Sequence, residues 1–196
     1  MAETRDRLLD EAELLFAVQG IQGTATREIV AAAGQRNPSA ISYHFGSRQN
    51  LLLEVLARRG GPVDDERGRR RDQAGLTPAV RDLVACLVVP YAELLGTGGG
   101  RAYVRIVAQL RGRFAAWRVE SDASTTKHLA RILDELESQV QGAPAVRRER
   151  IVGMVVLLTG VIAERAGRLE DDSGVELDHA AFVENLIDMC AGTITA

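Results

Sequence analysis

The sequence predicts an all-α protein that consists of a small N-terminal domain and a larger C-terminal one. Alanine, leucine and valine are abundant while aromatic residues make up only 4% of the chain, and this composition favours helices. Apolar residues recur at helical spacing through most of the sequence, and no segment alternates for long enough to predict a strand. Two glycines and a proline at residues 60–62 should end a helix. We therefore place a domain boundary there, with residues 1–60 in one domain and residues 61–196 in the other.

The bulk composition describes a soluble, folded protein with a slightly acidic balance. Apolar residues account for 46% of the 196 residues, charged residues for 26%, and the net charge is −3. Any affinity for nucleic acid must therefore come from a local patch of positive charge. Cys86 and Cys190 lie far apart in apolar segments and are expected to be small buried side chains. The N-terminus is charged from Glu3 onward, unlike a signal peptide, so we expect a cytoplasmic protein.

The first helix is expected over residues 4–19, as a support for the helices that follow. Leu8, Ala12, Leu15 and Phe16 fall on one apolar stripe at helical spacing, and the acidic residues lie largely on the other faces. A module of three or four such short helices buries little surface alone. We therefore expect it to pack against the rest of the chain.

Two short helices joined by a tight turn are expected in the segment that follows. Thr24 or Thr26 can cap the first of them, and Gly34 can end it because a glycine adopts a positive φ at little cost. Asn37 and Pro38 suit the cap and the first position of the second helix. The outer side of this second helix is polar, and such a pair of helices is typical of a helix-turn-helix motif.

The second short helix is expected over residues 38–45, and a longer helix begins after Ser47, whose side chain can cap it. Ile41 and Phe45 are four residues apart and share the inward face. Residues 27–59 carry five arginines and two glutamates, a net charge of +3 in a chain whose total is −3. Positive charge is thus concentrated where a DNA backbone would lie. The alternative is a compact helical hairpin that binds no nucleic acid.

Several short motifs in the first 60 residues carry a family resemblance. They are R-x-x-L-L-D-x-A at residues 5–12, L-F at 15–16, G-I-x-G-T at 20–24, R-E-I at 27–29, A-A-G at 32–34, Y-H-F at 43–45 and S-R-x-x-L-L at 47–52. Together they resemble the DNA-binding domain of the TetR family of bacterial transcriptional regulators, while the rest of the chain matches only in being helical. The sequence departs from the family pattern in two places. Ser42 stands where the family usually has a tyrosine, and the turn Q-R-N-P-S is one residue longer than usual.

Candidate DNA contacts follow from the motif positions and from side-chain chemistry. The side chains and helix N-terminal amides expected to hold phosphates belong to Thr24, Thr26, Arg27, Tyr43, Ser47 and Arg48. The residues best placed to meet or flank base edges are Asn37, Ser39, Ala40 and His44. The expected partner is a palindromic double-stranded DNA operator bound by a homodimer, because a two-fold dimer presents one reading helix to each of two successive major-groove faces.

Beyond the boundary, the sequence predicts a bundle of amphipathic helices. Residues 63–73 are dominated by charge, which predicts a solvated helix laced by acid–arginine pairs. A helix that starts near residue 77 should be kinked by Pro90, and the glycines of residues 96–100 predict a flexible connector. Two further amphipathic helices are expected over residues 101–117 and 121–140.

The last two helices predict a contact with a second copy of the chain. Residues 151–163 are uncharged and apolar around the whole circumference, but too short to span a bilayer, so they should be buried on all sides. The final helix carries two apolar stripes and needs two partners, one being the chain's own core. We expect the other to be a second copy, as the resemblance also implies, although a thick monomeric bundle is the alternative. The predicted interface residues are Ile151, Val155, Leu158, Ile162, Phe182, Leu186, Met189 and Cys190.

The resemblance further implies a pocket in the larger domain for a small-molecule effector, whose binding would change the spacing of the two reading helices. An apolar or amphipathic effector is expected. Each candidate lining residue is equally a candidate core residue. The candidates are Leu87, Tyr91, Tyr103, Val107, Leu110, Phe114, Trp117, Leu129, Leu158 and Ile162.

An enzyme is the class of function that the sequence argues against. His44, His128 and His179 are the only histidines, and no metalloprotease, nucleophile-elbow or dinucleotide-binding motif is present. We therefore expect no catalytic residues, no cofactor and no metal. A dimeric all-helical interaction protein without DNA binding stays a second hypothesis because of Ser42 and the longer turn.

Overall fold

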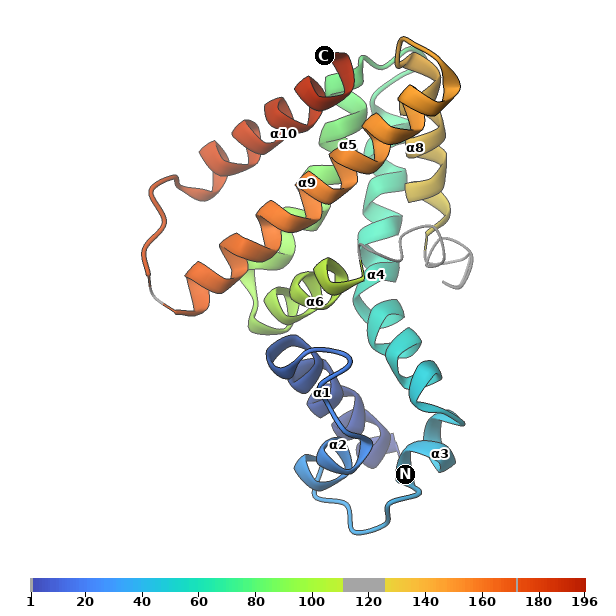
Figure 1. Ribbon diagram of the computed structural model, residues 1–196, viewed down its shortest axis with the longest axis vertical. Coiled ribbons are helices and arrows are strands. Elements are labelled where there is room, and N and C mark those ends of the chain that lie inside the picture. Colours follow the sequence, from blue (N-terminus) through green and yellow to red (C-terminus); the bar gives the residue numbers. More distant parts are fainter. Residues whose placement is uncertain (1, 111–125, 172) are drawn as a thin grey trace.

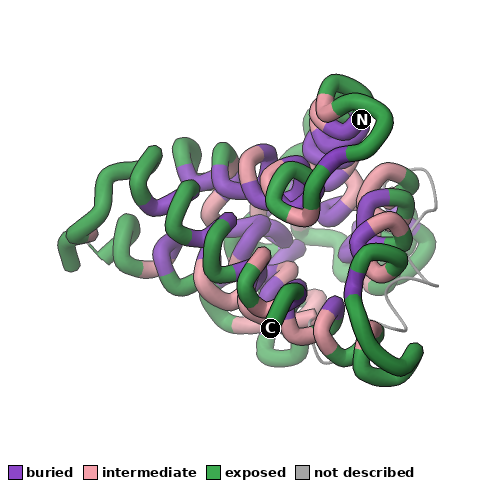
Figure 2. The backbone as a smooth tube through the Cα atoms, turned by 90° about the horizontal axis from the view of Figure 1, so that it is seen from above, coloured by how far each residue is buried: buried purple, intermediate pink, exposed green. Residues whose placement is uncertain are grey.

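Figure 1 shows the computed structural model, which describes residues 2–110, 126–171 and 173–196. Helices α1, α2 and α3 lie at one end of the long axis, and α4 leads from them into a bundle formed by the later helices. The described residues contain no strand, so the all-α prediction is confirmed. In Figure 2, buried residues lie on the sides of the helices that face one another, and exposed residues cover the outer sides.

The N-terminal domain packs around α1, which spans Ala2–Gln19. Leu8, Ala12 and Phe16 are completely buried, as the apolar stripe predicts. α2 (Thr26–Ala32) and α3 (Ala40–Phe45) contribute Ile29, Ile41 and Phe45 to the same core. The first helix therefore supports the helix-turn-helix, which confirms its predicted role.

The caps of the two short helices differ from the prediction. Ala25, and neither Thr24 nor Thr26, is the residue before α2, and its N–H donates to Glu28 Oε2 at 2.7 Å. α3 begins two residues later than expected because Asn37 Oδ1 accepts a hydrogen bond from the N–H of Ser39 at 2.9 Å, which holds the chain in a turn. Two predictions are confirmed: Gly34 adopts a φ of 68°, and Ser47 caps α4.

The expected helix end at residues 60–62 is wrong, because α4 runs without interruption over Arg48–Gln73. Gly60 is buried, and a Cβ added there would lie 2.9 Å from the hydroxyl of Tyr103. The glycine therefore permits a close approach of α6 and does not end the helix. α4 consequently belongs to both ends of the molecule, and the division at residue 60 stays a prediction.

The charged segment that follows is also less solvated than expected. The acid–arginine pairs are present, for example between Arg70 and Glu66 at 2.7 Å. Asp64, Arg67 and Arg71, however, lie on the inner face of α4 and are 1%, 8% and 9% exposed. This part of α4 is therefore a component of the core.

The C-terminal domain surrounds the second half of α4. Its elements are α5 (Val80–Glu93), the 3-10 turn η1 (Leu94–Gly96), α6 (Gly98–Gln109), α8 (Lys127–Gln139), α9 (Pro144–Glu170) and α10 (His179–Thr195). The expected glycine connector is wrong in part, because Gly98, Gly99 and Gly100 form the first turn of α6. Thr97 caps that turn, its Oγ1 accepting from the N–H of Gly100 at 3.1 Å.

The side chain of Gln109 links α6 to the end of α1 through two hydrogen bonds. Gln109 Nε2 donates to the carbonyl of Phe16 at 2.9 Å, and Gln109 Oε1 accepts from the N–H of Ile21 at 2.8 Å. The N-terminal domain therefore contacts the C-terminal domain through α6 as well as through the continuous α4, as the small size of the module predicts.

Candidate nucleic-acid interface and ligand cavity

α3 lies at the end of the molecule away from α9 and α10 (Figure 1), and Ser42 and Tyr43 on its outer side are exposed. Tyr43 is 71% exposed, and its ring lies edge-on to that of His44 at a centroid distance of 4.9 Å. Asn37 and Ser39 are also exposed, whereas His44 is partly buried. Chemically, this face offers amide, hydroxyl and imidazole groups of the kind that meet base edges.

Two of the predicted DNA contacts are corrected because their side chains are buried. Thr24 is 2% exposed, and its hydroxyl donates to the carbonyls of Gly20 at 2.9 Å and Leu15 at 3.1 Å. Ala40 is 6% exposed and packs in the core at the start of α3. Both residues stabilise the motif from inside and are not presented to a ligand.

Arg48 is also placed differently from the prediction. Its guanidinium donates to the carbonyl oxygen of Ile21 and, at 3.1 Å, to that of Thr24, and it lies 5.3 Å from the centre of the Phe16 ring. Three groups of the domain interior thus hold the side chain against the loop before α2. We reassign Arg48 from a phosphate contact to a residue that stabilises the domain.

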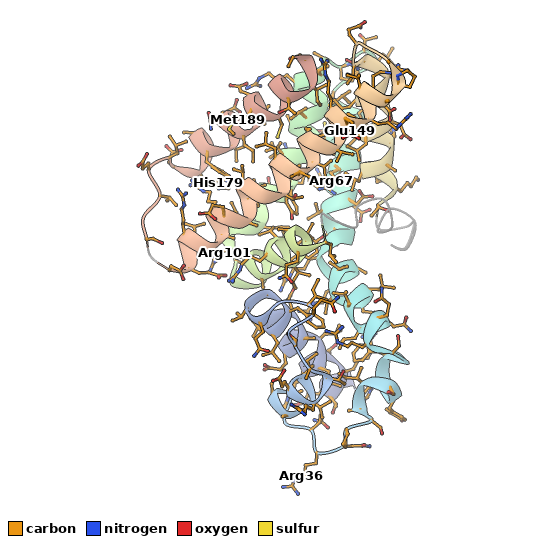
Figure 3. The ribbon with its side chains drawn as sticks, in the orientation of Figure 1. Arg36, Arg67, Arg101, Glu149, His179 and Met189 are labelled. Carbon is orange, nitrogen blue, oxygen red and sulfur yellow. The ribbon has the colours of Figure 1, made fainter. Side chains whose placement is uncertain are left out.

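The positive charge of this region is largely compensated within the chain. The carboxylate of Glu13, which is 3% exposed, accepts hydrogen bonds from Arg58 at 2.8 Å and from Arg59 at 2.6 Å. Arg27 and Arg36 are exposed and have no ion pair among the described residues. Arg36 projects from the tip of the N-terminal domain in Figure 3. These two arginines are therefore the cations best available to phosphates.

The C-terminal domain contains a cavity of about 50 Å³ between α4, α5, α6, α8 and α9. Seven of the ten predicted lining residues line it, namely Leu87, Tyr91, Tyr103, Val107, Leu110, Leu129 and Leu158. Ile162 is buried in the core but does not line this cavity, and Phe114 and Trp117 lie outside the described residues. The lining also includes Arg67, Val155 and Thr159, which the sequence analysis did not assign to it.

Two polar groups of the cavity lining lack hydrogen-bond partners among the described residues. The Nε atom of Arg67 and the hydroxyl of Tyr91 are buried without a hydrogen-bond partner in the described structure. Burial raises the pKa of Tyr91 well above its ordinary value and that of Tyr103 to about 12, so both phenols are neutral donors near pH 7. Burial also lowers the pKa of Arg67, although a guanidinium stays protonated in proteins.

The predicted dimer residues mostly lie in the chain's own core. Seven of the eight, all except Met189, are at most 7% exposed. Met189 is 41% exposed on α10, and Val152 and Val156 are 42% and 41% exposed on α9, which is therefore not buried on all sides within one chain. Figure 3 shows Met189 on the outer side of α10. Val152, Val156 and the predicted Met189 are therefore among the apolar side chains available to a second copy, and the two valines were not predicted.

Other chemical features of the described residues are few. Cys86 and Cys190 are buried and free, as expected, and burial raises the pKa of the Cys190 thiol to about 12. No group of three or more His, Cys, Asp or Glu side chains in the described ranges is arranged to hold a metal ion. In the same ranges, no helix has the length and hydropathy needed for a membrane span.

The fold and the exposed α3 define a helix-turn-helix protein with a helical C-terminal domain. Residues 8–55 match the family described as bacterial regulatory proteins, tetR family. This N-terminal segment is therefore similar to that family, which confirms the resemblance seen in the sequence motifs.

One of the similar proteins is a transcriptional repressor. The HTH-type transcriptional repressor KstR2 of Rhodococcus jostii is 38% identical over 68 residues, which are 35% of this chain and 31% of the repressor. The matched segment thus spans about a third of that relative's length.

Solved structures match the described fold over nearly the whole chain. A tetR family transcription regulator from Shewanella sp. PV-4 has a TM-score of 0.67 at 13% identity, with 98% of each chain covered. SmeT, the repressor of the Stenotrophomonas maltophilia multidrug efflux pump SmeDEF, has a TM-score of 0.59 at 22% identity, with 99% of this chain and 93% of SmeT covered.

Proposed function

We propose that the chain is a transcriptional regulator that binds a two-fold symmetric site on duplex DNA as a homodimer and responds to a small-molecule effector. The observation that carries the proposal is the exposed, polar outer side of α3, with Tyr43 71% exposed, at one end of the molecule. Two relatives named above are described as repressors, which supports repression as the mode of action. On this proposal the division at residue 60 separates a DNA-binding domain from an effector-binding and dimerisation domain.

DNA contacts on this proposal come from the exposed residues around α3. Arg27 and Arg36 bind phosphates, helped by the hydroxyls of Thr26, Tyr43 and Ser47. Asn37, Ser39 and His44 face base edges. Each protomer thus contributes two cations that have no ion pair in the described part of the chain, and a dimer contributes four. Because each neutralised phosphate lowers the slope of log K against log salt by about 0.9, we expect a slope of about −3.6.

Dimerisation on this proposal uses the outer sides of α9 and α10. Val152 and Val156 are exposed on one helix and Met189 on the other. Gly153 lies between the two helices, since a Cβ added there would be 3.7 Å from the side chain of Thr193. Apolar side chains on two adjoining helices give a surface that a two-fold copy can cover with its own equivalent residues.

On this proposal the cavity is coupled to the N-terminal domain by the continuous helix α4 and by the hydrogen bonds of Gln109. Arg67 lines the cavity from the same helix that begins at Arg48, directly after α3, and the two positions are about 29 Å apart along the helix axis. Gln109, adjacent to Leu110 in the cavity wall, holds the end of α1. An effector that binds one arrangement of α4 and α6 more tightly would shift the population of reading-helix spacings.

The direct test is a selection of bound sequences from random duplexes, followed by affinity measurements at two salt concentrations. Enrichment of a palindrome with nanomolar binding and steep salt dependence supports the proposal. Binding with no enriched sequence, or no binding, would favour the second hypothesis, a dimeric helical interaction protein. A monomer at micromolar concentration in sedimentation would contradict the dimer.

A further inference from the structure

One buried guanidinium beside the cavity lacks a full set of partners among the described residues. Arg67 is 8% exposed and lines the cavity, and its Nε atom has no hydrogen-bond partner among the described residues. The nearest carboxylate is that of Asp64, with 3.9 Å between Arg67 Nη1 and Asp64 Oδ1. This separation is too long for a hydrogen bond, so the cation is only partly compensated.

Asp64 cannot move closer without breaking other contacts. Its Oδ2 accepts from the N–H of His128 and its Oδ1 from the N–H of Leu129, both at 2.8 Å. These two N–H groups belong to the first turn of α8, where a carboxylate is favourable because the helix N-terminus is partly positive. Asp64 therefore holds α8 in place, and the Nε–H of Arg67 has no acceptor among the described residues.

A second unused donor lies next to Arg67. The guanidinium carbon of Arg67 is 5.8 Å from the centre of the Tyr91 ring, and the buried Tyr91 hydroxyl has no partner in the described part of the chain. Tyr103 packs edge-on to Tyr91 at 6.3 Å. The remaining polar residue in the lining, Thr159, already donates to the carbonyl of Val155 at 2.7 Å. The available donors thus gather around Arg67 and Tyr91.

The rest of the cavity wall is apolar. It consists of Leu87, Val107, Leu110, Leu129, Val155 and Leu158. A buried cation that is short of hydrogen-bond acceptors, set in an apolar wall, is matched by a ligand with one anionic group on an apolar body.

We propose that this cavity binds an amphipathic monocarboxylate, with Arg67 and Tyr91 donating to the carboxylate and the apolar wall enclosing the hydrocarbon part. The inference rests on the proposed effector role of the cavity and gives the chemical class of the effector. The cavity of about 50 Å³ has room for only a few waters. A carboxylate with a hydrocarbon tail must therefore displace the wall, including α4, and binding is coupled to the arrangement of that helix.

The test is calorimetric titration of the full chain with three matched series of ligands. The series are the straight-chain carboxylates from butanoate to decanoate, and the alcohols and amines of the same lengths. We expect at least one carboxylate to bind more tightly than its alcohol by about tenfold or more, as a charge-assisted hydrogen bond implies, and the amines not to bind. Equal affinity for the carboxylate and the alcohol, or no binding by any carboxylate, would overturn the proposal.

Two variants assign the preference to the named donors. Arg67→Met should remove the carboxylate preference, and Tyr91→Phe should weaken carboxylate binding several-fold. Tyr91→Phe removes a hydroxyl that has no partner among the residues that the structure describes, so the variant should fold as stably as the parent chain. It therefore keeps the test valid if Arg67→Met is unstable. If both single variants fold and both bind the carboxylate as tightly as the parent chain, Arg67 and Tyr91 are not the donors. If Arg67→Met does not fold, undiminished carboxylate affinity in Tyr91→Phe overturns the role of these donors.

DNA binding measured on the same protein separates this inference from the proposed function. Sequence-specific DNA binding without any carboxylate preference would overturn the ligand class and leave the regulator standing. Carboxylate binding by a chain that selects no DNA sequence would support the cavity assignment and contradict the regulator.

Discussion

Replacing Arg48 by alanine distinguishes a stabilising role from a phosphate contact. The substitution removes hydrogen bonds to the carbonyls of Ile21 and Thr24, each contributing about 1 kcal/mol, and a cation–π contact with Phe16 of about 0.5–1 kcal/mol. The free energy of unfolding should therefore fall by about 2–3 kcal/mol. For a chain of this size, the melting temperature should drop by about 5–10 °C, as measured by circular dichroism.

The salt dependence of DNA binding should not change in the Arg48→Ala variant, although its stability falls. Because Arg48 faces the domain interior, Arg48→Ala should leave the slope of log K against log salt unchanged at temperatures where the variant is folded. Arg27→Ala is the matched control: it removes an exposed, unpaired cation, so it should keep the parent melting temperature and reduce the slope by about 1.8 per dimer. An Arg48→Ala variant that melts like the parent and loses salt dependence would refute the reassignment.

Three further predictions concern stability and assembly. Glu13→Gln should lower the free energy of unfolding in urea by about 2 kcal/mol, because Arg58 and Arg59 lose a nearly buried carboxylate. Asp10→Asn, at the exposed end of the same cluster, should change it by less than about 0.5 kcal/mol. Equal effects of the two substitutions would contradict the stabilising role of Glu13. Val156→Glu should convert the dimer to monomers in sedimentation while Val18→Glu, at an exposed valine on α1, should not, and a dimeric Val156→Glu variant would rule out the α9–α10 interface. The folded chain keeps the Tyr103 proton up to about pH 12, whereas the unfolded chain loses it near pH 10, so the free energy of unfolding should fall as the pH rises from 10 to 12. The fall should be smaller in Tyr103→Phe, and an equal fall in both proteins would exclude Tyr103 as a cause.

Local signals in the sequence predicted the N-terminal domain well. The apolar stripe of α1, the positive φ of Gly34 and the cap at Ser47 depend on neighbours within a few residues, and the structure has all three. The cavity was also largely predictable, because long apolar and aromatic side chains in amphipathic helices must face the interior.

The errors occur where a distant residue decides the outcome. The glycine at position 60 indicated a helix end, but its contact is with Tyr103 on α6, which no local pattern reveals. A phosphate contact was also predicted for Arg48. Its partners in the structure are the carbonyls of the loop before α2, and such backbone groups leave no signature in the sequence.

Arg67 illustrates a signal that was present but obscured by charge. Leu56, Gly60, Val63 and Arg67 continue one helical stripe, and the structure buries all four. The stripe was hidden because the segment is rich in arginine and acid. Spacing, weighed above residue type, would have placed Arg67 inside the domain.

The most direct test of the account is a hydroxyl-radical footprint of the chain on its selected duplex, with the mass of the complex measured alongside. A dimer that presents α3 twice should give two chains per duplex and two protected segments, related by a two-fold axis and about one helical turn (~34–36 Å) apart. A single protected segment bound by one chain, or uniform protection along the duplex, would contradict the claim that α3 is presented twice by a dimer.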